Sequence, residues 1–192
     1  MAEALDPTRP APMRSDARQR REALLSAGEA CFREAGFAVP LEQIADRAGV
    51  GRGTLYRNFK DRMALALAIF DREVSELEKL IDPDKPLGEV LTAFVRRAAG
   101  GASLFQRIVG DMPLDDEHRA GFYKLRDRIL VAFKPLADKA HADGTLRPDI
   151  GPNRLLIATQ MINGTVKPYQ TPEERDAVIA EALDLLMRGL RP

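Results

Sequence analysis

The segment GVGRGTLYRNFK, residues 49–60, combines three alternating glycines with basic and hydroxyl side chains. Glycine lets a backbone approach a ligand closely, and clustered cationic groups attract phosphate. Two kinds of chemistry would use this combination: a loop that cradles the phosphates of a nucleotide, or a turn and helix that bind DNA. Three basic residues and no acidic residue lie between positions 48 and 60, so the positive charge is a local patch.

The residues around the glycines argue against a phosphate loop. A dinucleotide-binding fingerprint needs G-x-G-x-x-G directly after a β-strand. Counted from Gly49, the third glycine position holds Thr54, and the preceding LEQIADRA has the periodicity of an amphipathic helix. The chain also lacks the Gly-Lys-Ser/Thr of a P-loop.

A helix-turn-helix fits the same segment at each position. Ala45 is small where two helices must cross closely, and Gly49 can adopt the left-handed conformation that a tight turn between helices requires. A three-helix core is expected from Leu24, Phe32, Ile44, Val50, Leu55 and Phe59. The second helix of such a motif enters the major groove with its N-terminal residues.

That second helix carries groups suited to DNA. Arg52 has the reach and the forked donors for guanine O6 and N7, and the flanking glycines would allow close approach. Hydroxyl, amide and ammonium donors suited to phosphate oxygens follow on Thr54, Tyr56, Asn58 and Lys60.

The run LEQIADRAGVGRGTLYRNFKDRMAL, preceded by a helix ending in EAGF, resembles the DNA-binding domain of TetR-type transcriptional regulators. The signature spans residues 44–62, and the resemblance extends over about 15–70. It implies a homodimer that reads a palindromic operator in double-stranded DNA, usually as a repressor. It further implies that a small molecule bound in the C-terminal domain releases the protein from DNA.

The resemblance assigns roles by position. Gly51, Arg52 and Gly53 correspond to base-facing residues, Thr54 and Tyr56 to residues between base and backbone, and Asn58 and Lys60 to phosphate contacts. Arg62 replaces the usual lysine and keeps its charge. Val39-Pro40 stands where the family commonly has two hydroxyl residues, so one helix cap and its phosphate contact are missing.

Helical periodicity extends through the rest of the chain, with no convincing strand pattern. About nine helices are expected, at 15–35, 41–48, 52–58, 62–81, 87–99, 102–109, 118–142, 152–166 and 172–190. Pro135 should kink or break one of them. The fold class is all-α, with a disordered tail at 1–14, a three-helix DNA-binding domain at 15–60 and a helical ligand-binding and dimerisation domain at 61–192.

Two sets of apolar residues are assigned to the C-terminal domain. In the TetR fold the last two helices form the dimer interface, for which the candidates are Leu155, Ile162, Val178, Ile179, Ala182, Leu183, Leu186 and Leu190. The same stripe could instead pack inside one subunit. A pocket for a largely apolar effector is expected among Phe94, Phe105, Ile108, Met112, Phe122, Tyr123, Ile129, Phe133 and Met161, with His118, Gln160 and Asn163 as possible polar anchors. Taken singly, each aromatic residue is more readily explained as plain core.

Composition excludes several other classes. Lys plus Arg and Asp plus Glu both number 29, so the chain is no polycation. A single cysteine, Cys31, excludes an internal disulfide. No nucleophile–base pair is recognisable, and the acidic run at 111–117 lacks EF-hand spacing, so neither an enzyme, a metal site nor a cofactor is expected. Without a membrane span or signal peptide, we expect a cytoplasmic protein.

Two alternatives stay open at this stage. A helical small-molecule-binding protein with weak or lost operator binding would also explain Val39-Pro40 and the modest local charge. Arginines near the N-terminus, at positions 9, 14, 18, 20 and 21, could form an arm that reaches the minor groove. They could equally be a solvated face, since Asp16 and Glu22 lie among them.

Overall fold

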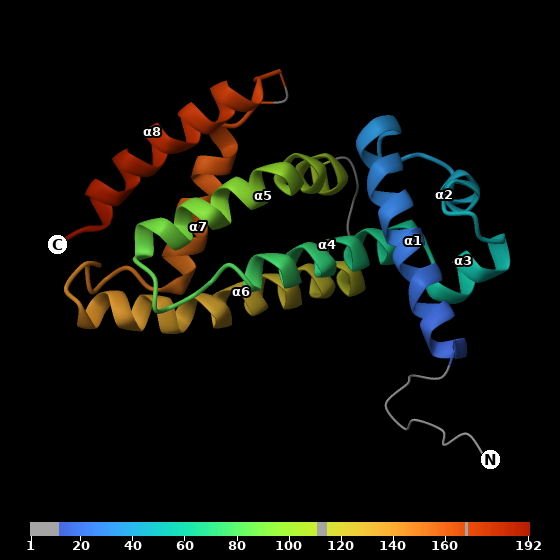
Figure 1. Cartoon of the computed structure of the whole chain (residues 1–192), viewed down its shortest axis with the longest axis horizontal. Helices are drawn as coiled ribbons and strands as arrows, with labels where there is room; N and C mark the ends of the chain where they lie inside the picture. The colour runs from blue at the N-terminus through green and yellow to red at the C-terminus, as the bar shows by residue number, and fades with distance from the viewer. Residues whose placement is uncertain (1–11, 111–114, 168) are drawn as a thin grey trace, which may run out of the picture. The chain divides into compact units, whose positions relative to one another are not determined.

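The computed structural model describes residues 12–110, 115–167 and 169–192, with the backbone alone described at 12–15 and 100–110. The described part of the chain forms eight α-helices and no strand, so the all-α prediction is confirmed (Figure 1). Contacts divide the chain into two compact units between Ile69 and Phe70. The division falls inside α4 (Arg62–Glu78), whose first turns belong to one unit and whose last turns belong to the other.

The first unit consists of α1 (Pro12–Ala35), α2 (Leu41–Arg47), α3 (Arg52–Asn58) and the first turns of α4. Helices as short as α2 and α3 have little stability in isolation and depend on packing. The packing comes from a core of buried side chains: Leu24, Phe32, Ile44, Ala45, Leu55, Phe59 and Leu65. The predicted three-helix core is therefore present, with Val50 half-buried at its edge.

Two contacts position α1 in this unit. A Cβ atom at Gly28 would lie 3.0 Å from Leu65 Cδ2 and 3.2 Å from Ile69 Cδ1, so glycine permits the close approach of α1 and α4. On its other side, α1 is tied to α2 by a two-pronged ion pair. Arg47 Nη1 donates to Glu34 Oε2 (2.5 Å), and Arg47 Nη2 donates to Glu34 Oε1 (2.9 Å). These hydrogen bonds hold the pKa of the Glu34 carboxyl below its usual value.

The turn between α2 and α3 requires Gly49, as the sequence predicts. Gly49 has φ +66°, in the left-handed region that residues with a Cβ rarely adopt. The N–H of Gly49 donates to the Asp46 carbonyl (3.1 Å), and the N–H of Val50 donates to the Ala45 carbonyl (3.0 Å). This pair of bonds is a Schellman motif, which satisfies the last carbonyls of α2 and starts the chain toward α3.

The second unit contains the last turns of α4 together with α5 (Leu87–Gly110), α6 (Asp116–Ala142), α7 (Pro152–Thr165) and α8 (Pro172–Leu190). Helix α5 packs against α7 and α8, and α7 also packs against α6 and α8 (Figure 1). The core between them includes Leu91, Phe94, Val95, Phe133, Leu136, Leu155, Ile162, Ile179 and Leu183. Helix α8 starts with a capping box between Thr171 and Glu174.

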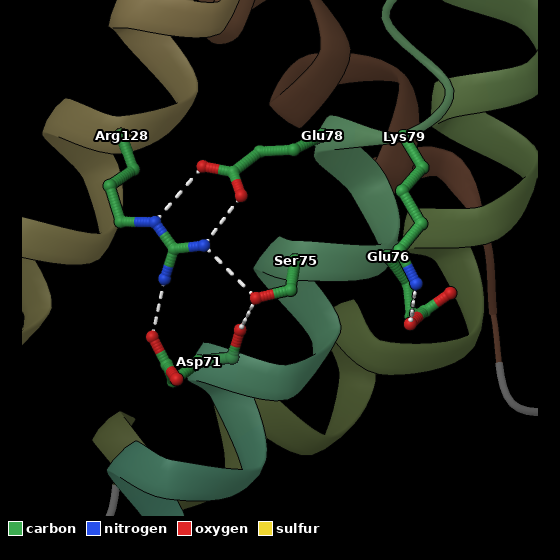
Figure 2. Close-up of polar contacts among 6 residues, drawn as sticks. All are labelled: Asp71, Ser75, Glu76, Glu78, Lys79 and Arg128. Carbon is green, nitrogen blue, oxygen red and sulfur yellow. Dashed lines mark hydrogen bonds and ion pairs between the residues drawn. The ribbon is translucent and has the colours of Figure 1, made fainter. Parts of the chain in front are cut away.

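One arginine of α6 is bonded to three side chains of α4 (Figure 2). Arg128 Nε and Nη2 donate to the two carboxylate oxygens of Glu78, at 2.9 and 2.5 Å. Its Nη2 also donates to Ser75 Oγ at 3.0 Å, and its Nη1 donates to Asp71 Oδ1. Residues 71, 75 and 78 lie on one face of a helix, so a single guanidinium holds two turns of α4 against α6.

The helix boundaries differ from the prediction in a few places. Helix α1 begins at Pro12, three residues before the expected start, while residues 1–11 of the expected tail lie outside the described residues. Helix α4 ends at Glu78, and the two helices expected at 87–99 and 102–109 form one helix, α5. Gly100 and Gly101 weaken a helix by only about 1 kcal/mol each, which the packing of α5 against α7 and α8 outweighs.

Pro135 lies inside α6 and does not end it. Proline removes one backbone donor and crowds the carbonyl four residues earlier. Helix α6 nevertheless continues to Ala142, because Leu136, Ala137 and Ala140 are buried in the core just beyond the proline. Of the kink or break expected at this position, the break is absent.

No helix in the described part of the chain combines the length and apolar character needed to cross a bilayer. Within the same residues, no group of three or more His, Cys, Asp or Glu side chains is arranged to hold a metal ion. Asp111, from the acidic run considered above, lies outside the described residues.

Candidate nucleic-acid interface

Helix α3 is held to its unit by very few side chains. Leu55 is the buried residue of the helix, and Phe59 follows it at the C-cap. The residues predicted to face DNA lie on α3 or beside it: Gly51, Arg52, Gly53, Tyr56 and Lys60 are exposed, and Thr54 and Asn58 are half-buried. The helix therefore turns most of its surface, including its cationic and hydroxyl groups, away from the core.

The glycines at 51 and 53 have no role in internal packing. Gly51 is the N-cap of α3 with φ −69°, a conformation that other residues adopt readily. A Cβ atom at Gly51 or Gly53 would meet no atom within 4 Å. Both positions therefore leave a flat stretch of backbone at the start of α3, which suits close approach by an external partner.

The Tyr56 hydroxyl is engaged within the protein by a residue that the sequence analysis did not select. It donates to Glu42 Oε1 of α2 at 2.9 Å. This bond raises the pKa of the Tyr56 phenol, so its proton stays in place. The pKa of the Glu42 carboxyl is lowered, first by a hydrogen bond from its own backbone N–H and then by Tyr56.

Nothing in the sequence alone marks Glu42 as part of the site. An acidic residue in the first turn of a helix is explained by the helix dipole, which favours negative charge there. Its partner is fourteen positions away on another helix, and only the crossing of α2 and α3 brings the two side chains together. The helix-turn-helix pattern predicts that α2 lies beside α3, but it does not indicate which residue of α2 contacts Tyr56.

Two polar residues of α3 are partly satisfied by the helix itself. Asn58 Nδ2 donates to the Thr54 carbonyl at 2.8 Å, which leaves its second amide hydrogen for a phosphate. Thr54 Oγ1 accepts from Arg57 Nη2 at 3.2 Å and keeps its own hydroxyl proton. Both side chains retain a donor for the roles predicted for them.

The departures from the family pattern have visible structural consequences. Pro40 is the N-cap of α2 and provides no side-chain hydrogen bond, so the cap predicted to be missing is absent from this helix start. Val39 is buried instead of facing outward. The Arg62 guanidinium lies over the Phe37 ring, with its carbon 5.6 Å from the ring centroid, so Arg62 packs on the first unit.

The basic residues near the N-terminus divide into two groups. Arg18, Arg20 and Arg21 lie on α1 and are exposed, and the Arg21 guanidinium stacks over Phe59 at 4.6 Å from its centroid. Arg9 lies outside the described residues, and the Arg14 side chain is likewise not described. The minor-groove arm stays a prediction.

The residues predicted to line an effector pocket do not form one group. Phe94 and Phe133 are buried with ring centroids 5.0 Å apart, Ile129 is buried beside them in the core, and Phe122 contacts Phe70 at 5.9 Å. Tyr123 and Met161 are exposed, with 56% and 66% of their surface accessible. Met112 lies outside the described residues, and the side chains of Phe105 and Ile108 are not described.

An open groove of about 700 Å³ lies elsewhere in the second unit. Its walls come from the α4–α5 connection, the C-terminal turns of α6 and the end of α8, and they include Leu87, Leu136, Lys139 and Met187. None of the predicted pocket residues whose side chains are described lines this groove. Of the predicted anchors, His118 lies at the start of α6, where its N–H donates to Asp115 (2.8 Å), and Gln160 and Asn163 lie on α7.

The predicted dimer residues are mostly turned inward. Leu155, Ile162, Ile179, Leu183 and Leu190 are buried in the core of the single chain, and Val178, Ala182 and Leu186 are half-buried. Their burial supports the alternative that the stripe packs inside one subunit. The exposed large apolar residues of these two helices are Ile157, Met161 and Leu185, at 46%, 66% and 66% exposure. A period-3.6 pattern finds an apolar face, but it cannot say which of two faces meets the core.

The sequence of the chain is similar to those of known transcription regulators. The family model described as "Bacterial regulatory proteins, tetR family" matches residues 24–69. The HTH-type transcriptional repressor KstR of Mycobacterium tuberculosis is 35% identical over 92 residues, 47% of this chain and 36% of that protein. The HTH-type transcriptional activator FasR of Mycolicibacterium smegmatis is 40% identical over 60 residues, 31% of this chain and 27% of that protein. The chain thus matches well under two thirds of the length of either curated relative.

One solved structure matches most of the chain. The TetR transcriptional regulator from Streptomyces coelicolor is 32% identical, with a TM-score of 0.60, and the match covers 90% of this chain and 98% of that one. The family model independently matches the segment that contains α2 and α3. The chain therefore belongs to the tetR family of bacterial regulatory proteins.

Proposed function

We propose that this protein is a sequence-specific DNA-binding transcription regulator, a binding protein and not an enzyme, whose α3 enters the major groove. The observation that carries the proposal is that α3 buries only Leu55 and exposes glycines, Arg52 and Tyr56 on its other sides. A helix that buries one residue and exposes guanidinium and hydroxyl donors can form hydrogen bonds with the edges of DNA bases. A regulator of bacterial genes acts in the cytoplasm, where we place it.

Within this proposal, different residues of α3 and its flanks contact the bases and the phosphates. Arg52 addresses a guanine, and Gly51 and Gly53 let the backbone lie close to the bases. Thr54 and Tyr56 lie between base and backbone, and Asn58 and Lys60 fix the register through phosphates. The exposed positions of Arg52 and Lys60 support these roles.

The regulator would act as a homodimer on a palindromic operator. One helix-turn-helix makes few contacts for tight specific binding, and two-fold related heads require half-sites about 34–36 Å apart or a multiple of that spacing. We assign the dimer surface to the outer faces of α7 and α8, around Ile157, Met161 and Leu185, because large apolar side chains there are exposed in the single chain.

We further infer that the protein is a repressor released by a small, largely apolar effector. Both signs of regulation occur among its relatives, since KstR is named a repressor and FasR an activator. The effector would bind in the second unit between α5, α6 and α7, by separating the buried apolar and aromatic side chains of Phe94, Ile129 and Phe133. Its binding would act on DNA affinity through α4, the continuous helix that belongs to both units.

The test is selection of bound duplexes from a random-sequence pool with the purified protein. The proposal expects enrichment of one palindromic motif, with binding that weakens steeply as salt rises. If a folded, ligand-free dimer enriches no motif over non-specific DNA, the alternative of a helical small-molecule-binding protein with lost operator binding takes its place. Mass spectrometry of the purified protein establishes that no ligand was carried through.

A further inference from the structure

We propose that Glu42 restrains Tyr56 and thereby sets the DNA selectivity of α3. In the free protein the Glu42 carboxylate holds the only hydroxyl proton of Tyr56, so DNA must compete with Glu42 for that proton. This inference rests on the proposed function, because it concerns how the same surface discriminates among DNA sequences.

The geometry places Glu42 at the edge of the candidate interface. It lies in the first turn of α2, is half-buried, and accepts from the Tyr56 hydroxyl at 2.9 Å. Tyr56 lies in the middle of α3 with 49% of its surface exposed, so the same side chain faces both Glu42 and the solvent side of the helix. Arg52 and Arg62 are close enough to Glu42 to stabilise its negative charge.

Tyr56 has a single hydroxyl proton, and this limits the groups to which it can donate a hydrogen bond. A phenol has one proton to donate, and its oxygen can otherwise only accept hydrogen bonds. While the proton points at Glu42, the Tyr56 oxygen has nothing to offer a DNA phosphate, whose oxygens are also acceptors. A phosphate contact therefore requires the hydroxyl to leave Glu42, and the Glu42 carboxylate remains nearby as a like charge.

Base edges are affected differently from phosphates. The amino groups of cytosine N4 and adenine N6 are donors in the major groove. Either can donate to the Tyr56 oxygen while the hydroxyl proton stays on its bond to Glu42. The pair therefore penalises binding that depends on phosphates alone and tolerates binding to a sequence with an amino group opposite Tyr56. Glu42 acts in this way as a specificity-determining residue that works through Tyr56.

A double-mutant cycle tests the restraint directly. Affinity is measured for four proteins: the natural chain, Glu42→Ala, Tyr56→Phe and the double variant. The probes are a random-sequence duplex and the duplex enriched from the pool by the natural chain. We expect Glu42→Ala to tighten binding to the random duplex by about 3- to 10-fold. The same change made together with Tyr56→Phe should have little effect, because no hydroxyl proton is left to release.

Asp46→Ala is the matched control, since it removes one exposed carboxylate from the same helix, and Asp46 has no side-chain hydrogen bond to Tyr56. Its effect reports the change in net charge alone, and thermal melting of each variant reports the fold. Glu42→Ala should increase the affinity for the enriched duplex less than the affinity for the random duplex. The ratio of specific to non-specific affinity should therefore fall.

Either of two results from the variants would overturn the inference. Equal tightening by Glu42→Ala in both Tyr56 backgrounds would show that Glu42 acts only through its charge. Weaker binding by a well-folded Glu42→Ala variant would show that Glu42 itself supports the complex. An enriched motif without any coupling between the two residues would remove this inference and leave the proposed function intact, whereas failure of the natural chain to enrich any duplex would remove both.

Discussion

At the scale of single residues, the three alternating glycines of residues 49–53 serve two different purposes. Gly49 has a positive φ and closes the turn after α2, so its absence of a side chain is required by the fold. Gly51 has an ordinary φ, and a Cβ at either Gly51 or Gly53 would meet open space. The fold does not require glycine at these two positions, so we assign their benefit to the DNA complex.

Substitution by alanine should separate these two purposes. Gly49→Ala should lower the free energy of unfolding by roughly 1–2 kcal/mol, because alanine is strained in the left-handed region. Gly53→Ala should leave stability unchanged or raise it by up to about 1 kcal/mol, since alanine is the better helix residue. The same Gly53→Ala change should weaken binding to the selected duplex by about 5-fold or more, as expected for a methyl group forced into a close contact.

Urea denaturation and a DNA titration of both variants check this prediction. A Gly53→Ala variant that is clearly less stable than the natural chain would show that the fold itself needs glycine there. Unchanged DNA affinity for that variant would remove Gly53 from the interface.

At the scale of elements, local sequence signals predicted most helices, and tertiary packing accounts for the places where they did not. The limits of α3 and α8 agree with the prediction, because clear start and stop residues such as Thr171 with Glu174 mark them. The predicted break at Gly100-Gly101 is absent, and α6 continues through Pro135, because packing of α5 and α6 in the second unit compensates for weak local propensity.

The same distinction explains what could be foreseen of the candidate site. The residues of α3 lie in one short segment, so their spacing alone brings them to one helix. The Glu42–Tyr56 contact depends on how two helices cross, and the direction of the α7 and α8 faces depends on which side packs inward. Sequence periodicity contains neither piece of information.

The Arg128 cluster is the element-scale contact with the clearest energetic consequence. Arg128→Met keeps the apolar stem but removes the hydrogen bonds to Asp71, Ser75 and Glu78, and leaves two carboxylates facing α6. The side chain is 36% exposed, so solvent screening limits the loss to about 1 kcal/mol. That corresponds to a decrease in Tm of about 2–4 °C.

Lys79→Met is the matched control for this prediction (Figure 2). Lys79 lies just beyond the end of α4 and pairs with Glu76 of that helix at 2.6 Å, but both side chains are well exposed and neither is bonded to α6. Differential scanning calorimetry should therefore show almost no change in Tm for Lys79→Met. Equal decreases for the two variants would mean that the contact with α6 adds nothing beyond an ordinary surface ion pair.

At the level of the whole molecule, binding to a palindromic operator, as proposed, requires two copies of the chain. Leu155, Ile179 and Leu183 are buried in the single chain, so we do not assign them to the contact with a partner. The proposed dimer surface therefore consists of the opposite faces of α7 and α8. Exposed apolar groups of this size stabilise an interface when they become buried, at about 25 cal/mol per Å² of apolar surface.

A charge placed on this surface should separate the subunits. Leu185→Asp should raise the dissociation constant of the dimer by about 10-fold or more, since a central apolar contact is replaced by a buried carboxylate. Val131→Asp is the control, because Val131 is 74% exposed on α6, outside the two helices. Sedimentation velocity over a range of concentrations measures both variants. A dimer that tolerates Leu185→Asp, or that is disrupted by both changes alike, would contradict the assignment of the interface.

We propose that the exposed face of α3 recognises DNA sequence, with Arg52 contacting a base and Lys60 contacting a phosphate. The most direct test compares Arg52→Ala and Lys60→Ala on the selected palindrome and on an unrelated duplex, at two salt concentrations. Arg52→Ala should lose about 1–3 kcal/mol of discrimination between the duplexes. Lys60→Ala should weaken binding to both duplexes alike and reduce the salt slope by about one. A well-folded Arg52→Ala protein that still prefers the palindrome as strongly as the natural chain would contradict the account.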